Sequence, residues 1–175
     1  MKKFELTAES KINIFGKKLF RIKALISFGD VEEGETGGWI EKEENLEQSS
    51  GDAWVYGDAE VSGNARVYGN ARVSGNARVS GNAEVYGNAR VSGDAEVYGN
   101  ADYTTIHGFG TQFRTTTFFQ CEDKQIRVSC GCFLGTIPEF REQVKNTREG
   151  KIAEEYLMIA DLMEKHFVKE KESGE

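Results

Sequence analysis

The sequence predicts a mainly β protein in which a wound rod of about three coils stands between two capping segments. A six-residue repeat fills residues 49–102. The chain has 20 glycines, concentrated in this block, but a single proline, which indicates a repeat architecture rather than a Pro-rich disordered chain. Helical patterning begins only at Thr136. The predicted units are a hairpin with an acidic capping segment, the rod, a second hairpin and a helical pair, at residues 1–48, 49–102, 103–135 and 136–175.

The segment before the repeat is predicted to cap one end of the rod. Residues 11–25 have the pattern of two strands joined around Gly16, a hairpin with which the stretch FEL at Phe4 can pair. Trp39 and Trp54 are large apolar residues that we interpret as lids over the first coil. Caps are expected because bare coil ends expose unpaired strand edges.

The repeat itself predicts strands separated by tight turns. Nine units run from SSGDAW at Ser49 to VYGNAD at Asp102, with an aliphatic first residue in all but one and Ala at the fifth position in each. Residues four apart share one face of a strand, so Val and Ala both point inward. The Gly-Asn or Gly-Asp pair between them turns the chain, since these residues tolerate left-handed backbone. Three such faces make one coil, and coils stack at about 4.8 Å.

Residues eighteen apart are predicted to stack in columns on the outside of the rod. The sixth-position columns are Glu60, Arg78 and Glu96; Arg66 and Glu84; and Trp54, Arg72 and Arg90. Opposite charges mostly alternate along them, Arg72 over Arg90 being the exception, and Trp54 is placed for a cation–π contact with Arg72. Tyr68 over Tyr86 is either an aromatic ladder that holds the stack or a flat surface for a partner.

The region after the repeat is predicted to form the other cap. Residues 103–113 are irregular, and residues 113–133 read as a hairpin that turns at Glu122-Asp123-Lys124. Thr136 begins a helix to about residue 146, as its N-cap, with Pro in the first turn and Glu three residues after the cap. A second helix over 151–167 has a core-facing stripe. The stripe consists of Ile152, Tyr156, Ile159, Met163 and Phe167.

The repeat V-x-G-N-A-x resembles the hexapeptide repeat of left-handed parallel β-helices, and the left-handed winding is implied by that resemblance alone. The run RIKALISFGDVEEGETGGWIEKEENLEQSSGDAWVYGDA resembles the leading segment of uncharacterised bacterial and phage β-helix proteins, some labelled transferases on fold analogy. The VSCGCF stretch with its helical pair resembles the ends of phage and prophage proteins. Because left-handed β-helices often form trimers, the resemblance implies a homo-oligomer, a dimer or a trimer.

Charge and composition narrow the function classes. The net charge of −7 argues against direct nucleic acid binding. Residues 30–48 carry eight acids against one Lys, which is either a solvated loop or an acidic patch for a basic partner. The candidate acids are Glu32, Glu33, Glu35, Glu41, Glu43 and Glu44. Three cysteines without paired CxxC motifs and the lack of a long apolar run predict a protein of the bacterial cytoplasm without a signal peptide or membrane span.

Catalytic residue types are scarce. The β-helical carbonic anhydrases hold zinc with three histidines, whereas this chain has only His107 and His166. The hexapeptide acyltransferases use a His base between subunits, so His107 is the alternative catalytic candidate. A weaker alternative is a zinc site, although the Cys-x-Cys spacing is one residue short of the usual motif and buried thiols are favoured. Its ligands would be Cys121, Cys130, Cys132 and His107. No cofactor is predicted.

The favoured hypothesis is therefore a non-enzymatic protein-binding module. The residues predicted to contact the partner are Tyr68, Tyr86, Trp54, Arg72, Arg90 and the acids of residues 30–48. Given the phage-like resemblance, we expect an accessory protein that binds and inhibits a host macromolecule, for example a defence (CRISPR) nuclease complex. The alternatives are an acyltransferase-like enzyme with His107 as base and a structural component of a virion.

Overall fold

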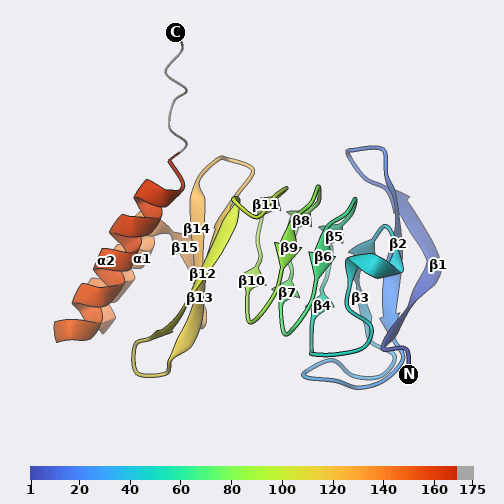
Figure 1. Ribbon diagram of the computed structural model, residues 1–175, viewed down its shortest axis with the longest axis horizontal. Helices are drawn as coiled ribbons and strands as arrows, with labels where there is room; N and C mark the ends of the chain where they lie inside the picture. The colour runs from blue at the N-terminus through green and yellow to red at the C-terminus, as the bar shows by residue number, and fades with distance from the viewer. Residues whose placement is uncertain (169–175) are drawn as a thin grey trace, which may run out of the picture.

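A stack of parallel coils forms the middle of the molecule (Figure 1) in the computed structural model, which describes residues 1–168. Each strand of the stack has two residues and pairs in parallel with the strand eighteen residues later, as the repeat predicts. The strands are β4 (Trp54–Val55), β5 (Glu60–Val61), β6 (Arg66–Val67), β7 (Arg72–Val73), β8 (Arg78–Val79), β9 (Glu84–Val85), β10 (Arg90–Val91) and β11 (Glu96–Val97). They form three ladders, β5-β8-β11, β4-β7-β10 and β6-β9.

Valine and alanine fill the inside of the coils, and both positions are at most 1% exposed from Ala53 to Val97, whereas Ala101 in the last unit is exposed. The corner glycines from Gly51 to Gly93 take positive φ and the asparagines do not, which differs from the expectation for the Gly-Asn pair. The Asn side chains instead form ladders along the corners, as in the bond from Asn64 Nδ2 to Asn82 Oδ1 at 3.2 Å. In the same way, Asn76 Nδ2 donates a hydrogen bond to Asp94 Oδ1 at 3.1 Å.

Parallel pairing in the coil stack already begins before Ser49, the residue at which the predicted repeat unit starts. Strand β3 (Thr36–Ile40) pairs in parallel with β5, with Ile40 beside Val61, and Leu46 forms a parallel bridge to Val67. A short 3-10 helix, η1 (Glu43–Asn45), lies between them. This first coil is irregular and lacks the Gly-Asn-Ala signature, which is why the sequence pattern does not reveal it.

The N-terminal hairpin extends one ladder of the stack. Strands β1 (Phe4–Ile12) and β2 (Lys18–Ala24) are antiparallel, and β2 pairs with β3, so one sheet runs β1-β2-β3-β5-β8-β11. The predicted hairpin and its turn are confirmed, and the stretch FEL pairs with β2 as the beginning of β1 rather than as a separate strand. The turn carries Phe15, whose ring lies 5.9 Å from that of Tyr98 in the last coil.

A four-stranded antiparallel sheet closes the other end. It consists of β12 (Tyr103–Phe109), β13 (Arg114–Gln120), β14 (Ile126–Cys130) and β15 (Phe133–Thr136), in that order. The predicted hairpin is confirmed as β13 and β14, but the expectation of irregular structure over 103–113 is wrong for residues 103–109 and holds only for the turn at 110–113. Strand β12 forms there because Thr104, Thr105 and Ile106 are β-branched and pair with β13.

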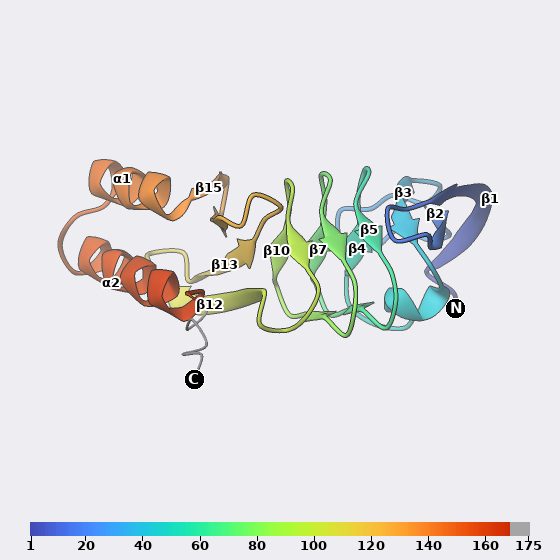
Figure 2. The ribbon, with the colours of Figure 1, turned by 90° about the horizontal axis from the view of Figure 1, so that it is seen from above.

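Strand β13 separates two hydrophobic cores. Phe119 packs with the coil interior, whereas its neighbour Phe118 packs with the helices, and both are fully buried. Figure 2 shows the helices and the coils on opposite sides of this sheet. The alternation of side chains along a strand explains how one strand serves both cores.

Two helices complete the fold, α1 (Ile137–Thr147) and α2 (Gly150–His166). The predicted cap is confirmed: Thr136 Oγ1 accepts from the Glu139 backbone N–H at 3.3 Å, and Glu139 Oε2 accepts from the Thr136 N–H at 2.7 Å. In the predicted stripe of α2, Tyr156, Ile159 and Met163 are buried. The last seven residues of the predicted unit 136–175 lie outside the described residues.

Candidate interaction surfaces

The two tyrosines predicted to stack do so on the ladder formed by β6 and β9. Their ring centroids are 5.3 Å apart and their planes differ by 12°. The Tyr68 hydroxyl donates to Glu84 Oε2 at 3.2 Å, and the Arg66 guanidinium lies 5.6 Å from the Tyr68 ring. Burial and the neighbouring Glu84 carboxylate raise the pKa of Tyr68. Tyr86 is 52% exposed, so the pair supports the stack and also presents a flat ring to solvent.

A hollow beside Tyr68 brings part of the acidic segment to this ladder. Its polar lining comes from η1, the residues after it and β6, namely Glu43, Glu44, Glu47, Gln48, Arg66 and Tyr68. We use the name tyrosine face for the surface made by Glu43, Glu44, Glu47, Arg66, Tyr68, Glu84 and Tyr86. Glu43 also pairs with Lys2 at 2.7 Å, an exposed ion pair of small energetic value.

The remaining acids do not join this surface, so residues 30–48 do not form one acidic patch. Glu41 Oε2 accepts from the Gly63 N–H at 2.7 Å, and its other oxygen lies 3.3 Å from Lys17 Nζ. The Gly63 bond is the main reason that the pKa of Glu41 lies below its usual value. Glu41 thus fastens the hairpin and the first coil together.

Three further candidate acids, Glu32, Glu33 and Glu35, lie in the loop between β2 and β3. Glu35 is half-buried and accepts from the Glu32 N–H at 3.1 Å, while Glu32 and Glu33 are exposed. The same loop packs on the β4-β7-β10 ladder through Asp30. These acids are therefore separated from Glu43 and Glu44, which lie beside β6.

Trp54, Arg72 and Arg90 stack in the predicted register. Segments outside the repeat, which the spacing does not place, surround two members of this column. Trp54 is completely buried, with its ring 5.5 Å from Phe28 and 6.1 Å from Phe4, so this predicted binding residue does not reach the surface of the described structure. Arg72 pairs with Asp30 at 2.6 Å. This ion pair relieves the repulsion between Arg72 and Arg90, which the sequence pattern leaves unexplained.

The structure does not assemble the alternative zinc site. Within residues 1–168, no group of three or more His, Cys, Asp and Glu side chains is close enough to hold a metal ion. Cys121 lies under the last coil, where it bridges Ala95, and burial raises its pKa to about 11. Cys130 accepts a hydrogen bond from Thr116 at 3.2 Å. His107 lies on β12, exposed, with Nδ1 3.2 Å from Thr115 Oγ1.

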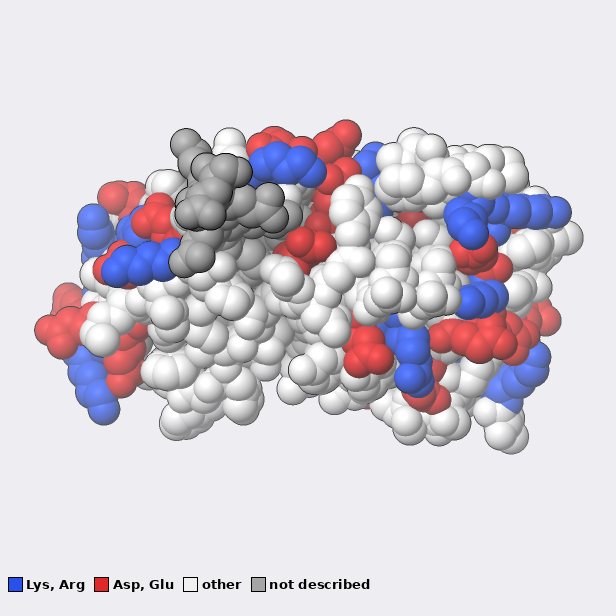
Figure 3. Space-filling model, turned by 45° about the horizontal axis from the view of Figure 1, so that its top comes forward, with Lys and Arg blue, Asp and Glu red and all other residues white. Residues whose placement is uncertain are grey.

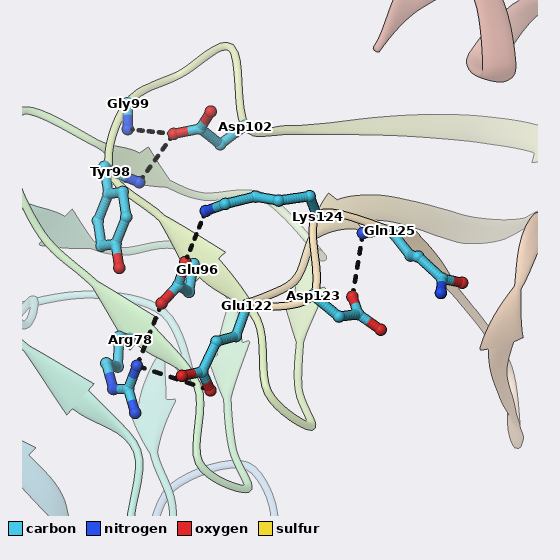
Figure 4. A network of polar contacts seen from close by, with 9 residues as sticks. All are labelled: Arg78, Glu96, Tyr98, Gly99, Asp102, Glu122, Asp123, Lys124 and Gln125. Carbon is cyan, nitrogen blue, oxygen red and sulfur yellow. Dashed lines mark hydrogen bonds and ion pairs between the residues drawn. The ribbon is translucent and has the colours of Figure 1, made fainter. Parts of the chain in front are cut away.

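A polar network joins the last coil to the C-terminal sheet (Figure 4). Glu96 is 8% exposed and pairs with Arg78 at 3.1 Å, as its column predicts, and with Lys124 at 3.2 Å. Glu122 lies 4.0 Å from the same arginine. Lys124 was not foreseen as a partner, because it lies in a hairpin turn and only the tertiary fold brings it to the coil. The network holds the two parts of the molecule in register.

Comparison with known proteins agrees with the coil stack. A family model described as the YdcK beta solenoid repeat matches residues 59–73, 71–86 and 83–99. No curated protein matches the chain significantly. The matched repeats and the stacked parallel strands show that the chain is a β-helix repeat protein. In residues 1–168, the structure contains no helix with the length and apolar character needed to cross a membrane.

Proposed function

We propose that the protein is a non-enzymatic protein-binding module that contacts its partner through the tyrosine face. The observation that carries the proposal is the stacked pair Tyr68 and Tyr86 on a short, flat ladder, with Tyr86 half-exposed. Tyrosine is enriched at protein interfaces because a rigid ring supplies much contact area at little cost in conformational entropy.

Charge around the tyrosines favours a basic partner. Glu43, Glu44 and Glu47 line the hollow beside Tyr68, and Arg66 is the one basic residue in that lining. An acidic rim around an aromatic centre speeds association with a basic surface and disfavours acidic ones. The partner we propose is a basic host protein, such as a subunit of a nuclease complex used in defence, which the module would inhibit by covering its nucleic acid site.

Affinity capture from bacterial extract tests this proposal. Wild-type protein, Tyr86→Ala and Met158→Ala are used as bait, since Met158 is an equally accessible apolar residue on α2, 69% exposed. We expect one stoichiometric partner that Met158→Ala retains and Tyr86→Ala loses. A loss of affinity of about 2 kcal/mol is typical of a central interface tyrosine. Neutralising Glu43 and Glu44 to Gln should slow association and weaken its dependence on salt.

Capture that is equal for all baits, or the absence of any partner, would contradict the proposal. The two alternatives stay predictions with tests of their own. Turnover of acyl-CoA that disappears in His107→Ala would favour the enzyme. Detection of the chain in purified virus particles by mass spectrometry would favour the structural component.

A further inference from the structure

A second hollow lies between the last regular coil and the C-terminal sheet, one corner further along the chain than Tyr86 of the tyrosine face. It is lined by β10 and the corner before it, by β12 and β13, and by the turn after β14. The lining residues used in the argument are Asn88, Arg90, His107, Phe113, Arg114 and Thr115. The described lining contains no Asp or Glu, in a chain whose net charge is −7. Its volume of about 810 Å³ is in the range of small-molecule sites.

The two arginines of this hollow are not neutralised by carboxylates of the described chain. Other arginines, such as Arg72 and Arg141, have a carboxylate oxygen within 2.6 Å. Arg90 and Arg114 are exposed, and no Asp or Glu oxygen of residues 1–168 comes within 4 Å of either guanidinium. Two guanidinium groups that line one hollow without carboxylate partners are suited to phosphate, whose oxygens each guanidinium can bind in a bidentate manner.

The backbone around the hollow supports both a cationic and an aromatic contact. Gly131 has φ of 64°, and a Cβ there would collide with Arg114 Nη1, so the absence of a side chain makes room for this guanidinium. Phe113 has φ of 49°, a left-handed conformation that is unfavourable for a bulky residue. Its ring is nevertheless 65% exposed at the rim of the hollow. Strained backbone that displays an apolar ring beside cations is a feature of ligand sites.

We propose that this hollow binds a phosphorylated ligand of mononucleotide size. The phosphoryl group contacts Arg90 and Arg114, with the Asn88 amide and the Thr115 hydroxyl as further donors, and a planar ring stacks on Phe113. The site shares no residue with the tyrosine face, so its test and the capture experiment can fail independently.

Titration calorimetry with adenosine monophosphate, inorganic phosphate and adenosine tests the proposal on the full chain. We expect saturable binding of adenosine monophosphate, weaker binding of phosphate and the weakest binding of adenosine. Arg90→Gln and Arg114→Gln should each lower the affinity for the nucleotide about tenfold, a change of about 1.4 kcal/mol. Phe113→Ala should weaken binding of the nucleotide but not of phosphate.

Arg66→Gln is the matched control, because Arg66 is also exposed but lies on the tyrosine face. It should bind the nucleotide as the wild type does, and circular dichroism verifies that each variant is folded. The proposal is overturned if adenosine monophosphate shows no saturation, if both arginine variants stay within about twofold of wild type, or if Arg66→Gln loses as much. A short single-stranded oligonucleotide that binds more tightly through the same arginines would replace it with a nucleic acid surface.

Discussion

Corner glycines determine how closely successive coils approach each other. Gly75 has φ of 69°, and a Cβ added to it would lie 2.8 Å from the backbone nitrogen of Gly93 in the next coil. Gly57 has a similar φ of 59°, but nothing lies within 4 Å of its added Cβ. The two positions therefore separate the cost of left-handed backbone from the cost of crowding between coils.

Gly75→Ala should destabilise the protein more than Gly57→Ala. We expect Gly57→Ala to lower the free energy of unfolding by about 1 kcal/mol, the cost of left-handed backbone for a residue with a Cβ. Gly75→Ala should cost about 2–3 kcal/mol, because the coils must also move apart. Urea denaturation measures both values. Equal losses in the two variants would show that crowding at the corner is not important.

Single residues also show where sequence reasoning fails. The register of Trp54 with Arg72 follows from the repeat and is confirmed, yet the burial of Trp54 does not follow from it. Phe4 and Phe28 cover the indole, and they come from segments that have no repeat to place them. The spacing of a repeat predicts neighbours within the stack, whereas contacts from outside the stack depend on the tertiary fold.

Among the elements, the regular strands, the two hairpins and the two helices were predictable, whereas the first coil and β12 were not. Strands β4 to β11 follow from the six-residue period, and α1 follows from its Thr136 cap. The first coil lacks the repeat signature and is defined by partners more distant in sequence. Strand β12 carries β-branched residues, but only its pairing with β13 shows that they form a strand. The candidate surfaces follow the same division. The stack of Tyr68 on Tyr86 follows from the repeat, whereas the position of η1 beside Tyr68 and the hollow that His107 lines depend on contacts between segments distant in sequence.

Glu96 on β11 links the last coil to the turn between β13 and β14 through its ion pair with Lys124. Its removal should weaken that link, and the loss of stability should depend on pH. Burial raises the pKa of Glu96, but hydrogen bonds from Tyr98 and Lys124 and the nearby cations outweigh this, so the pKa lies below the usual 4.5. A carboxyl group with a lowered pKa stabilises the fold above pH 4.5, and this contribution is lost as the pH falls through the folded-state pKa.

Glu96→Gln should therefore lower the free energy of unfolding at pH 7 by about 1–2 kcal/mol. The difference from wild type should shrink as the pH falls below 4.5, the usual value. Glu122→Gln is the control, because its side chain is 64% exposed and contacts the same arginine at only 4.0 Å. Urea denaturation at several pH values provides the comparison. If Glu96→Gln lost the same free energy of unfolding at every pH, the proposed contribution of the Glu96 carboxylate charge would be contradicted.

For the whole molecule, the main problem is how the two ends of the stack satisfy their open backbone groups. At the first coil, Lys3 Nζ donates to the carbonyl oxygens of Gly51 at 3.3 Å and Ala53 at 3.1 Å. At the last coil, the Glu122 N–H donates to Asp94 O at 3.0 Å. Both ends are thus closed by segments outside the repeat.

Lys3→Ala should open the first end of the stack. Lys3 is 4% exposed, and its loss leaves two carbonyl groups without their donor, at a cost of about 2 kcal/mol. Lys2→Ala is the control: Lys2 makes only an exposed pair with Glu43, worth about 0–1 kcal/mol. In Lys3→Ala, the rate of amide hydrogen exchange should increase over wild type more in β4 than in α1. Uniform acceleration throughout the chain would contradict a local closing role.

Self-association is the remaining proposal at this scale. If the flat ladders pair between copies, light scattering should give two or three times the mass of one chain. The resulting mass should fall to that of a single chain for Tyr86→Lys, which places a charge on the tyrosine face, but not for Met158→Lys on α2. A single-chain mass for the wild type would rule out the proposed homo-oligomer.

The turn of the N-terminal hairpin spans the stack, since Phe15 meets Tyr98 in its last coil. Each additional coil would carry that tyrosine about 4.8 Å farther away. The length of the hairpin therefore fits the present number of coils. If a unit of eighteen residues were duplicated, Phe15 would no longer reach Tyr98. A duplication of eighteen residues would therefore add a stacking interface but remove the contact that ties the hairpin to the last coil.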